Sequence, residues 1–220
     1  MFNPDKKYIH SDGVDLPIMY VYLAGRIAGE CIDKCLAWRH KIIDFYADYK
    51  GKGVYPISFL DALNSKEADS IDKKGLTSSI PPNLIYDKDI LSVERADVVV
   101  AMMDDYMEEG INFFSYPHYD VRKDEIDLNA LSKEELLDQI IELENKILER
   151  RPNWGTDYEV SIAMYLKKPV ILIAGNERQK AMLEKHPFMR RCSVIVGSID
   201  ELLEKKWLNI CYKSISGAIY

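Results

Sequence analysis

The chain has 220 residues, of which 47% are hydrophobic and 30% are charged, a composition typical of a globular protein. Lys and Arg number 29 against 36 for Asp and Glu, so the net charge of −7 disfavours a basic face for nucleic acid binding. The sequence has no run of about 18 apolar residues, and its polar start lacks the apolar core of a signal peptide. We therefore expect a cytoplasmic protein whose partners include neither a nucleic acid polymer nor a membrane.

Four cysteines, Cys31, Cys35, Cys192 and Cys211, are distributed over the chain. Cys31 and Cys35 are one helical turn apart, a spacing that suits two metal ligands. No nearby Cys or His pair completes such a site, and His40 is the nearest candidate. We therefore expect no metal and interpret the cysteines as reduced structural thiols.

Apolar runs and amphipathic stretches alternate along the chain. In chain order they predict a strand at 17–24, a helix at 30–49, a strand at 53–57, a helix at 87–95, a strand at 96–102, a helix at 156–166, a strand at 170–174, a helix at 178–185, a strand at 193–196 and a helix at 199–206. This alternation predicts an α/β fold with a doubly wound, mostly parallel sheet of the flavodoxin-like or Rossmann-like kind and right-handed crossovers.

Two segments interrupt this rhythm. The polar stretch 60–82 is interpreted as a long loop, of the kind that often closes over a site. The second, 104–151, is predicted to be a helical insertion, because Ser132-Lys-Glu-Glu135 forms a capping-box pattern before an apolar helical face. That face suits a brace on its own subunit, an oligomer contact or a lid. We expect one domain over 1–220 that contains this insertion.

Ligands of open parallel sheets bind outside the carboxyl ends of the strands. The first such place is the turn after strand 17–24, where Gly25 and Gly29 are separated by three residues, so the dinucleotide-binding pattern is absent. Gly25 favours either close approach of a ligand to the backbone or a tight turn without a ligand.

Two carboxylates are the remaining site candidates. Asp89 is interpreted as lying early in the helix at 87–95, where an acidic residue often only compensates the helix dipole. Glu159 is placed in the first turn of the helix opened by Gly155 and Thr156, beside apolar residues that face the core. A carboxylate there is expensive to bury without a partner, which indicates a functional site, whereas favouring the helix dipole is the alternative.

Several motifs follow one another in the order of a known family. They are Tyr22-Leu-Ala-Gly25, Trp38-Arg39, Asp89 with Ala96-Asp-Val-Val-Val-Ala101, Gly155-Thr-Asp-Tyr-Glu159 with Lys168-Pro169-Val170, and Gly217-Ala-Ile-Tyr220. In this order they resemble the nucleoside 2-deoxyribosyltransferases over most of the chain outside the insertion. The resemblance implies an enzyme that acts on N-glycosidic bonds and needs no cofactor.

The resemblance also implies roles for individual residues. Glu159 is the expected nucleophile, which forms a covalent glycosyl-enzyme, as in retaining glycosidases. Tyr22 is expected to orient the Glu159 carboxylate by a hydrogen bond. Asp89 is expected to face the departing base and to move a proton onto its ring nitrogen.

Five further positions are expected to contact the substrate. They are Gly25, Arg26, Asn153, Gly155 and Tyr220. Asn153 replaces the aspartate that holds the sugar 5′-hydroxyl in the transferases and the serine found in related deoxynucleotide hydrolases. Arg26 suits either a phosphate contact or an exposed or ion-paired position. The C-terminal Tyr220 resembles the transferase tail that reaches a neighbouring subunit, so a homo-oligomer with shared sites is implied.

The expected activity is transfer of 2-deoxyribose between nucleobases, with deoxynucleosides and free nucleobases as partners. Hydrolysis of a deoxynucleoside or of a nucleoside 5′-monophosphate is the alternative, in which water resolves the same intermediate. A non-catalytic nucleotide-binding module is the third interpretation, and the joint presence of Tyr22, Asp89 and Glu159 counts against it.

Overall fold

In a computed structural model of the chain we describe residues 8–11, 14–25, 32–48, 53–61, 81–103, 132 and 154–216. All of these except residue 132 belong to one compact unit, formed by residues 1–104 and 153–220. The predicted helix of the 104–151 insertion and most of the predicted loop at 60–82 lie outside the described residues.

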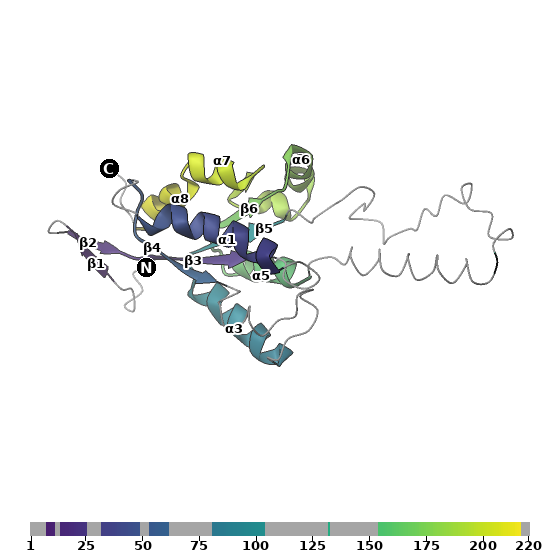
Figure 1. The fold of residues 1–220 in the computed structure, drawn as a ribbon, viewed down its shortest axis with the longest axis horizontal. Helices are drawn as coiled ribbons and strands as arrows, with labels where there is room; N and C mark the ends of the chain where they lie inside the picture. Colours follow the sequence, from purple (N-terminus) through teal and green to yellow (C-terminus); the bar gives the residue numbers. More distant parts are fainter. Residues whose placement is uncertain are drawn as a thin grey trace. The chain divides into compact units, whose positions relative to one another are not determined.

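The described elements alternate as the sequence predicts (Figure 1). In order they are β1 (Tyr8–Ser11), β2 (Val14–Pro17), β3 (Met19–Ala24), α1 (Ile32–Ala47), β4 (Ile57–Asp61), α3 (Pro82–Arg95), β5 (Val98–Met102), α5 (Trp154–Tyr165), β6 (Val170–Ile173), α6 (Glu177–Lys185), the 3-10 helix η1 (Met189–Arg191), β7 (Val194–Val196), α7 (Ile199–Glu204) and α8 (Trp207–Ser216). β1 and β2 form a separate antiparallel pair, which the sequence analysis did not predict.

The main sheet has five parallel strands in the order β4-β3-β5-β6-β7. After β3, the chain first adds β4 on one side of it and then adds β5, β6 and β7 on the other side, as in doubly wound flavodoxin-like sheets. The fold is α/β and doubly wound, as predicted. The order of the strands reverses between β3 and β5, and ligands of such sheets bind at the carboxyl ends of the strands beside this point.

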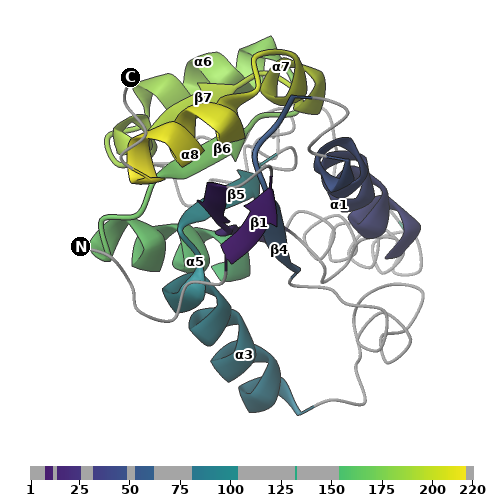
Figure 2. The same ribbon diagram turned by 90° about the vertical axis from the view of Figure 1, so that its left-hand side faces the viewer.

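The two faces of the sheet are covered by different helices. Figures 1 and 2 show α7 and α8 on one side of the sheet and α3 and α5 on the other. Val21 and Leu23 of β3 join the core that contains Ile42 of α1 and Leu208 of α8. Because successive side chains of a strand point to opposite faces, Tyr22 points to the side of α3 and α5.

Two predicted boundaries near the site were wrong. α3 begins at Pro82 rather than at 87, because the proline at the start of the helix has a suitable φ and needs no N–H partner. α5 begins at Trp154 rather than at 156. Asp89 therefore lies in the middle of α3, and Glu159 lies in the second turn of α5. Compensation of the helix dipole at the first turn consequently explains neither carboxylate.

The second predicted strand was also misplaced, since β4 occupies Ile57–Asp61 and not 53–57. The backbone N–H of Tyr55 donates to the side chain of Asn209 at 3.4 Å, and the Asn209 amide donates to the carbonyl of Gly53 at 3.4 Å. These backbone groups are thus satisfied by α8, a helix that the sequence analysis did not predict.

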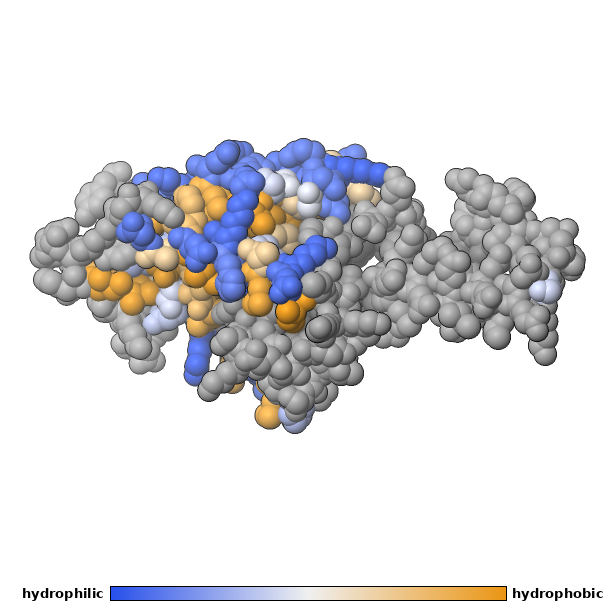
Figure 3. Space-filling model, in the orientation of Figure 1, coloured by the Kyte–Doolittle hydropathy of each residue, from blue (hydrophilic) through white to orange (hydrophobic). Residues whose placement is uncertain are grey.

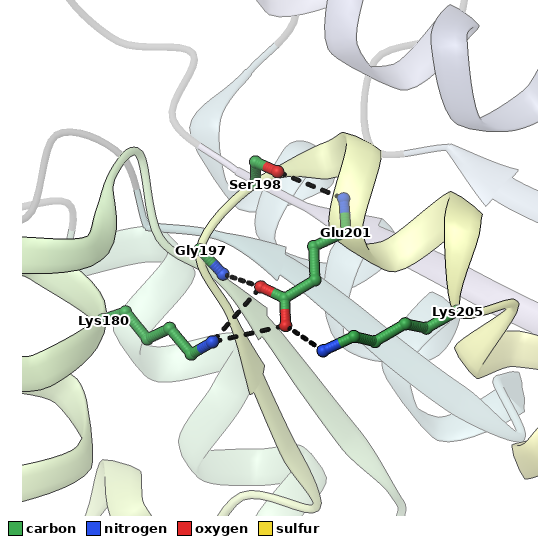
Figure 4. Close-up of polar contacts among 5 residues, drawn as sticks. All are labelled: Lys180, Gly197, Ser198, Glu201 and Lys205. Atoms are coloured by element: carbon green, nitrogen blue, oxygen red, sulfur yellow. Dashed lines mark hydrogen bonds and ion pairs between the residues drawn. The ribbon is translucent and has the colours of Figure 1, made fainter.

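A polar cluster closes the carboxyl end of β7 (Figure 4). One carboxylate oxygen of Glu201 accepts the Gly197 N–H at 2.7 Å, and the other accepts the Lys205 ammonium at 2.7 Å. Lys180 of α6 lies 3.2 Å from the same carboxylate. Hydrogen bonding from Lys205 and Gly197 lowers the pKa of Glu201 to about 2. These contacts hold the carboxylate at the start of α7.

The surface over α6 and α7 is strongly hydrophilic (Figure 3). In the described ranges, no helix is long and apolar enough to cross a membrane. Burial raises the pKa of the Cys192 thiol to about 12 and that of Cys211 to about 11, so neither is a reactive thiolate near neutral pH.

Candidate active site

The centre of the candidate site is a hydrogen bond between Tyr22 of β3 and Glu159 of α5. The phenol O–H donates to Glu159 Oε1 at 2.6 Å. Tyr22 is fully buried and Glu159 is 8% exposed. The two residues are 137 positions apart in the chain. The fold therefore brings together the predicted nucleophile and the tyrosine predicted to orient it.

The position of Glu159 follows from the apolar pattern of α5. Val160 and Ala163, which follow it on the helix, are completely buried, and the helix packs against β3, β5 and β6. Glu159 is therefore carried into the space between the helix and the sheet. Burial is costly for a carboxylate, and it raises the pKa of Glu159 to about 8 despite the hydrogen bond from Tyr22, which lowers it.

Asp89 contributes a second carboxylate to the same site. Its side chain on α3 is 16% exposed and lies 3.2 Å from the ammonium of Lys88. The negative charge of Asp89 raises the pKa values of both Tyr22 and Glu159, although burial is the larger cause in each case. α3 and α5 contact each other, so the three predicted catalytic residues form one electrostatic cluster.

Gly25, directly after β3, has a structural reason to lack a side chain. A Cβ atom at this position would lie 2.7 Å from a ring carbon of Trp38 and 3.3 Å from the Cβ of Met102. The glycine therefore allows α1 to pack closely over the end of β3. A contact between Gly25 and the substrate stays a prediction.

The other predicted substrate contacts divide into two groups. Gly155 is exposed in the first turn of α5, on the same helix as Glu159. Arg26, Asn153 and Tyr220 lie outside the described residues, so their contacts with a substrate stay predictions. Within the described ranges, no three His, Cys, Asp or Glu side chains are grouped as metal ligands would be.

Two charged residues of the recognised motifs lie away from the site. Asp97, before β5, accepts the backbone N–H of Tyr20 at 2.9 Å, which joins the beginnings of two neighbouring strands. Lys168 donates to the carbonyl of Glu94 at 2.7 Å and to that of Ala96, both at the end of α3. These residues stabilise the amino-terminal edge of the sheet, opposite the edge where ligands of doubly wound sheets generally bind.

The sequence analysis assigned no role to Arg39, yet its side chain is completely buried. Nη1 donates to the carbonyl of Cys35 at 2.6 Å, and Nη2 donates to the carbonyl of Gly25 at 3.1 Å. A signal existed in the sequence, because Arg39 shares an apolar helical stripe with Cys35, Ile42 and Tyr46. An arginine on such a stripe predicts a buried guanidinium whose N–H groups bond within the protein.

A tyrosine pair joins the two helices beside the carboxylates. Tyr86 of α3 donates its O–H to the hydroxyl of Tyr158 on α5 at 2.8 Å, and the rings stack with centroids 5.7 Å apart. Both side chains are about half exposed. Tyr86 is one turn before Asp89, and Tyr158 directly precedes Glu159, so this contact joins the two helices next to the carboxylates.

No protein-family model and no curated protein matches the chain. A conserved protein from Enterococcus faecalis V583 is similar in structure, with a TM-score of 0.44 and 14% identity over 87% of this chain and 98% of its own. A CMP N-glycosidase from Clostridium botulinum has a TM-score of 0.39 and 15% identity over 86% of this chain and 98% of its own. At these scores neither likeness carries weight for the fold or the activity.

Proposed function

We propose that this chain is an enzyme that transfers 2-deoxyribose between nucleobases by way of a covalent intermediate on Glu159. The observation that carries the proposal is the buried Tyr22–Glu159 hydrogen bond at the switch point of a doubly wound sheet. A carboxylate that is removed from water and held by one directed donor suits nucleophilic attack on a sugar carbon.

In the first half-reaction, a Glu159 carboxylate oxygen bonds to the anomeric carbon while the bond from that carbon to the base nitrogen breaks. Tyr22 holds Oε1, so Oε2 is the oxygen assigned to the attack. The electron pair of the broken bond goes to the base, and its ring nitrogen takes up a proton from solvent that is passed on by Asp89. In the second half-reaction, an incoming base displaces Glu159 and returns a proton to Asp89, so the original configuration is restored.

The pKa of Glu159 predicts how such an enzyme depends on pH. Attack requires the ionised carboxylate, and a pKa of about 8 leaves roughly a tenth of the free enzyme ionised at pH 7. We expect kcat/KM to rise tenfold per pH unit below pH 8 and to level above it, as far as Glu159 alone determines the profile.

The direct test is a chromatographic assay of the purified protein with deoxyinosine, with and without free adenine. Deoxyadenosine that forms only with adenine supports the transfer. Hypoxanthine that forms at the same rate in both assays contradicts it and supports hydrolysis, with deoxyinosine 5′-monophosphate as the next substrate.

The matched variants are Glu159→Gln and Glu204→Gln. Glu159→Gln should abolish turnover, whereas Glu204→Gln removes an exposed carboxylate on α7 and should leave turnover unchanged. Retention of more than a trace of activity by Glu159→Gln would remove Glu159 as the nucleophile.

A further inference from the structure

The beginning of α3 is held less firmly by packing than its end. Of the side chains described in this helix, Val93 near its end is the single completely buried one, and every described side chain before it is half-buried or exposed. The end is also fastened by Lys168, which donates to the carbonyls of Glu94 and Ala96. Burial of apolar surface is the main force that holds a helix on a sheet. The place of the first turns of α3 therefore depends on other contacts.

α5 differs from α3 in this respect. Its buried side chains extend from the first turn to the third and are Thr156, Glu159, Val160 and Ala163. The helix packs against β3, β5 and β6. α5 is therefore the fixed member of the helix pair, and the beginning of α3 is placed by its contacts with α5.

The contact that joins the second turns of both helices is the pair of Tyr86 and Tyr158. The hydroxyl of Tyr86 donates to that of Tyr158 at 2.8 Å, and the stacked rings have centroids 5.7 Å apart and planes inclined by 30°. Both side chains are about half exposed, so water competes for the same hydroxyls and the bond adds little to the stability of the fold. Because the bond is directed, it restricts where the two helices lie.

Asp89 lies between the two points at which α3 is held. It follows Tyr86 by one turn and precedes Val93 by one turn, and its side chain is 16% exposed. Tyr158 is the direct chain neighbour of Glu159, which α5 keeps buried. A shift of the beginning of α3 therefore moves Asp89 while Glu159 stays in place.

We propose that Tyr86 and Tyr158 are positioning residues, whose mutual hydrogen bond holds the beginning of α3 on α5 and thereby places Asp89 to serve the departing base. The inference rests on the proposed function for its kinetic consequence. The placement of Asp89 concerns the protein without substrate and is measurable separately.

The kinetic experiment compares Tyr86→Phe and Tyr158→Phe in the assay with deoxyinosine and adenine. Each change removes one hydroxyl of the hydrogen bond and keeps both rings. A displacement of about 1 Å can cost about a hundredfold in rate, so we expect kcat to fall by up to about a hundredfold while KM changes little. The variant with both changes should lose no more than either single variant, because the same bond is removed. Tyr165→Phe is the matched control, since it removes a hydroxyl from an 84% exposed position of α5.

Asp89→Asn separates a loss of positioning from a general loosening of the fold. When the tyrosine pair acts through Asp89, Tyr86→Phe slows the Asp89→Asn enzyme much less than it slows the native enzyme. Losses that multiply in the combined variant would mean that the pair acts elsewhere and would overturn the proposal. An unchanged kcat in both Tyr86→Phe and Tyr158→Phe would overturn it as well.

The second experiment needs no substrate and measures the repulsion between Asp89 and Glu159. The charge of Asp89 raises the pKa of Glu159, so the two side chains destabilise each other at pH 9, where Glu159 is mostly ionised. A double-mutant cycle of Asp89→Asn and Glu159→Gln in urea unfolding gives this coupling. We expect a weaker coupling in Tyr86→Phe and in Tyr158→Phe, because a freed helix start lets the charges move apart, and an unchanged one in Tyr165→Phe.

An undiminished coupling in both Tyr86→Phe and Tyr158→Phe would overturn the placement of Asp89 by the pair. If the parent protein has no glycosidic activity, the proposed function fails, while the unfolding cycle still decides whether the tyrosines place Asp89.

Discussion

Replacing Glu159 by Gln should make the protein more stable at neutral and alkaline pH. The folded state raises the pKa of Glu159 from 4.5 to about 8, mainly through burial. Between these two values the unfolded chain is ionised at this position while the folded protein holds a proton. Stability is therefore fully present below pH 4.5 and is lost as the pH rises to about 8, above which this contribution is constant. Gln has no charge to bury, so this loss should disappear.

The size of the effect follows from the two pKa values. At pH 7 the unfolded carboxyl lies 2.5 units above its pKa of 4.5, and each unit corresponds to about 1.4 kcal/mol. The native protein should thus lose about 3 kcal/mol between pH 4 and pH 7, and in total about 5 kcal/mol by pH 9. These values are large against the 5–15 kcal/mol that typically stabilises a domain.

The assay is urea unfolding of the native protein and Glu159→Gln at pH 4, 5, 6, 7, 8 and 9, followed by circular dichroism. The difference in unfolding free energy should widen between pH 5 and pH 8 and then stay constant. Glu204→Gln is the matched control, since it removes an exposed carboxylate from the same unit. Parallel curves for the native protein and Glu159→Gln would refute the conclusion that this carboxylate is destabilised by burial.

Three other substitutions test separate parts of the structure. Gly25→Ala places a methyl group 2.7 Å from the Trp38 ring and should lower the free energy of unfolding by urea by about 1–3 kcal/mol. Trp38→Leu should recover part of this loss. An unchanged free energy of unfolding in Gly25→Ala would contradict this packing. Glu201 has a pKa of about 2, so its contribution should be lost as the pH falls from 4.5 to 2, and Glu201→Gln should flatten this acid limb in thermal unfolding. Burial lowers the pKa of His186, whose Nδ1 accepts the Met189 N–H at 3.1 Å, so stability should fall below pH 6.5; an equal fall in His186→Gln would exclude it as the cause.

The sequence was most informative where elements are buried on both faces. The strands at 19–24, 98–102 and 170–173 coincide with predicted apolar runs, because a central parallel strand has no polar face to blur the pattern. The edge strand β4 was misplaced by four residues. Its place depends on Asn209, which binds the backbone of residues 53 and 55, and a contact across 154 positions leaves no local signal.

The residues of the candidate site could be predicted from the sequence, but their burial and their positions within the helices could not. Tyr22, Asp89 and Glu159 were found from motif order, and the structure brings them together. Arg39 was not assigned a role, because a charged residue in a helix is usually solvated. Its burial depends on a contact with the carbonyl of Gly25 after β3, which lies far from it in the sequence. The start of α3 was also predicted wrongly. Because Pro82 begins the helix, Asp89 lies in its middle, where compensation of the helix dipole does not explain an acidic residue.

The cost of burying Glu159 is explicable if the residue forms a covalent bond. As a free carboxylate it is destabilised by lost hydration, as its pKa of about 8 indicates. Attachment to a sugar turns the anion into a neutral ester, which a dry site does not penalise. In the proposed mechanism, the burial that weakens the folded protein therefore favours formation of the intermediate, while the hydrogen bond from Tyr22 holds the carboxylate.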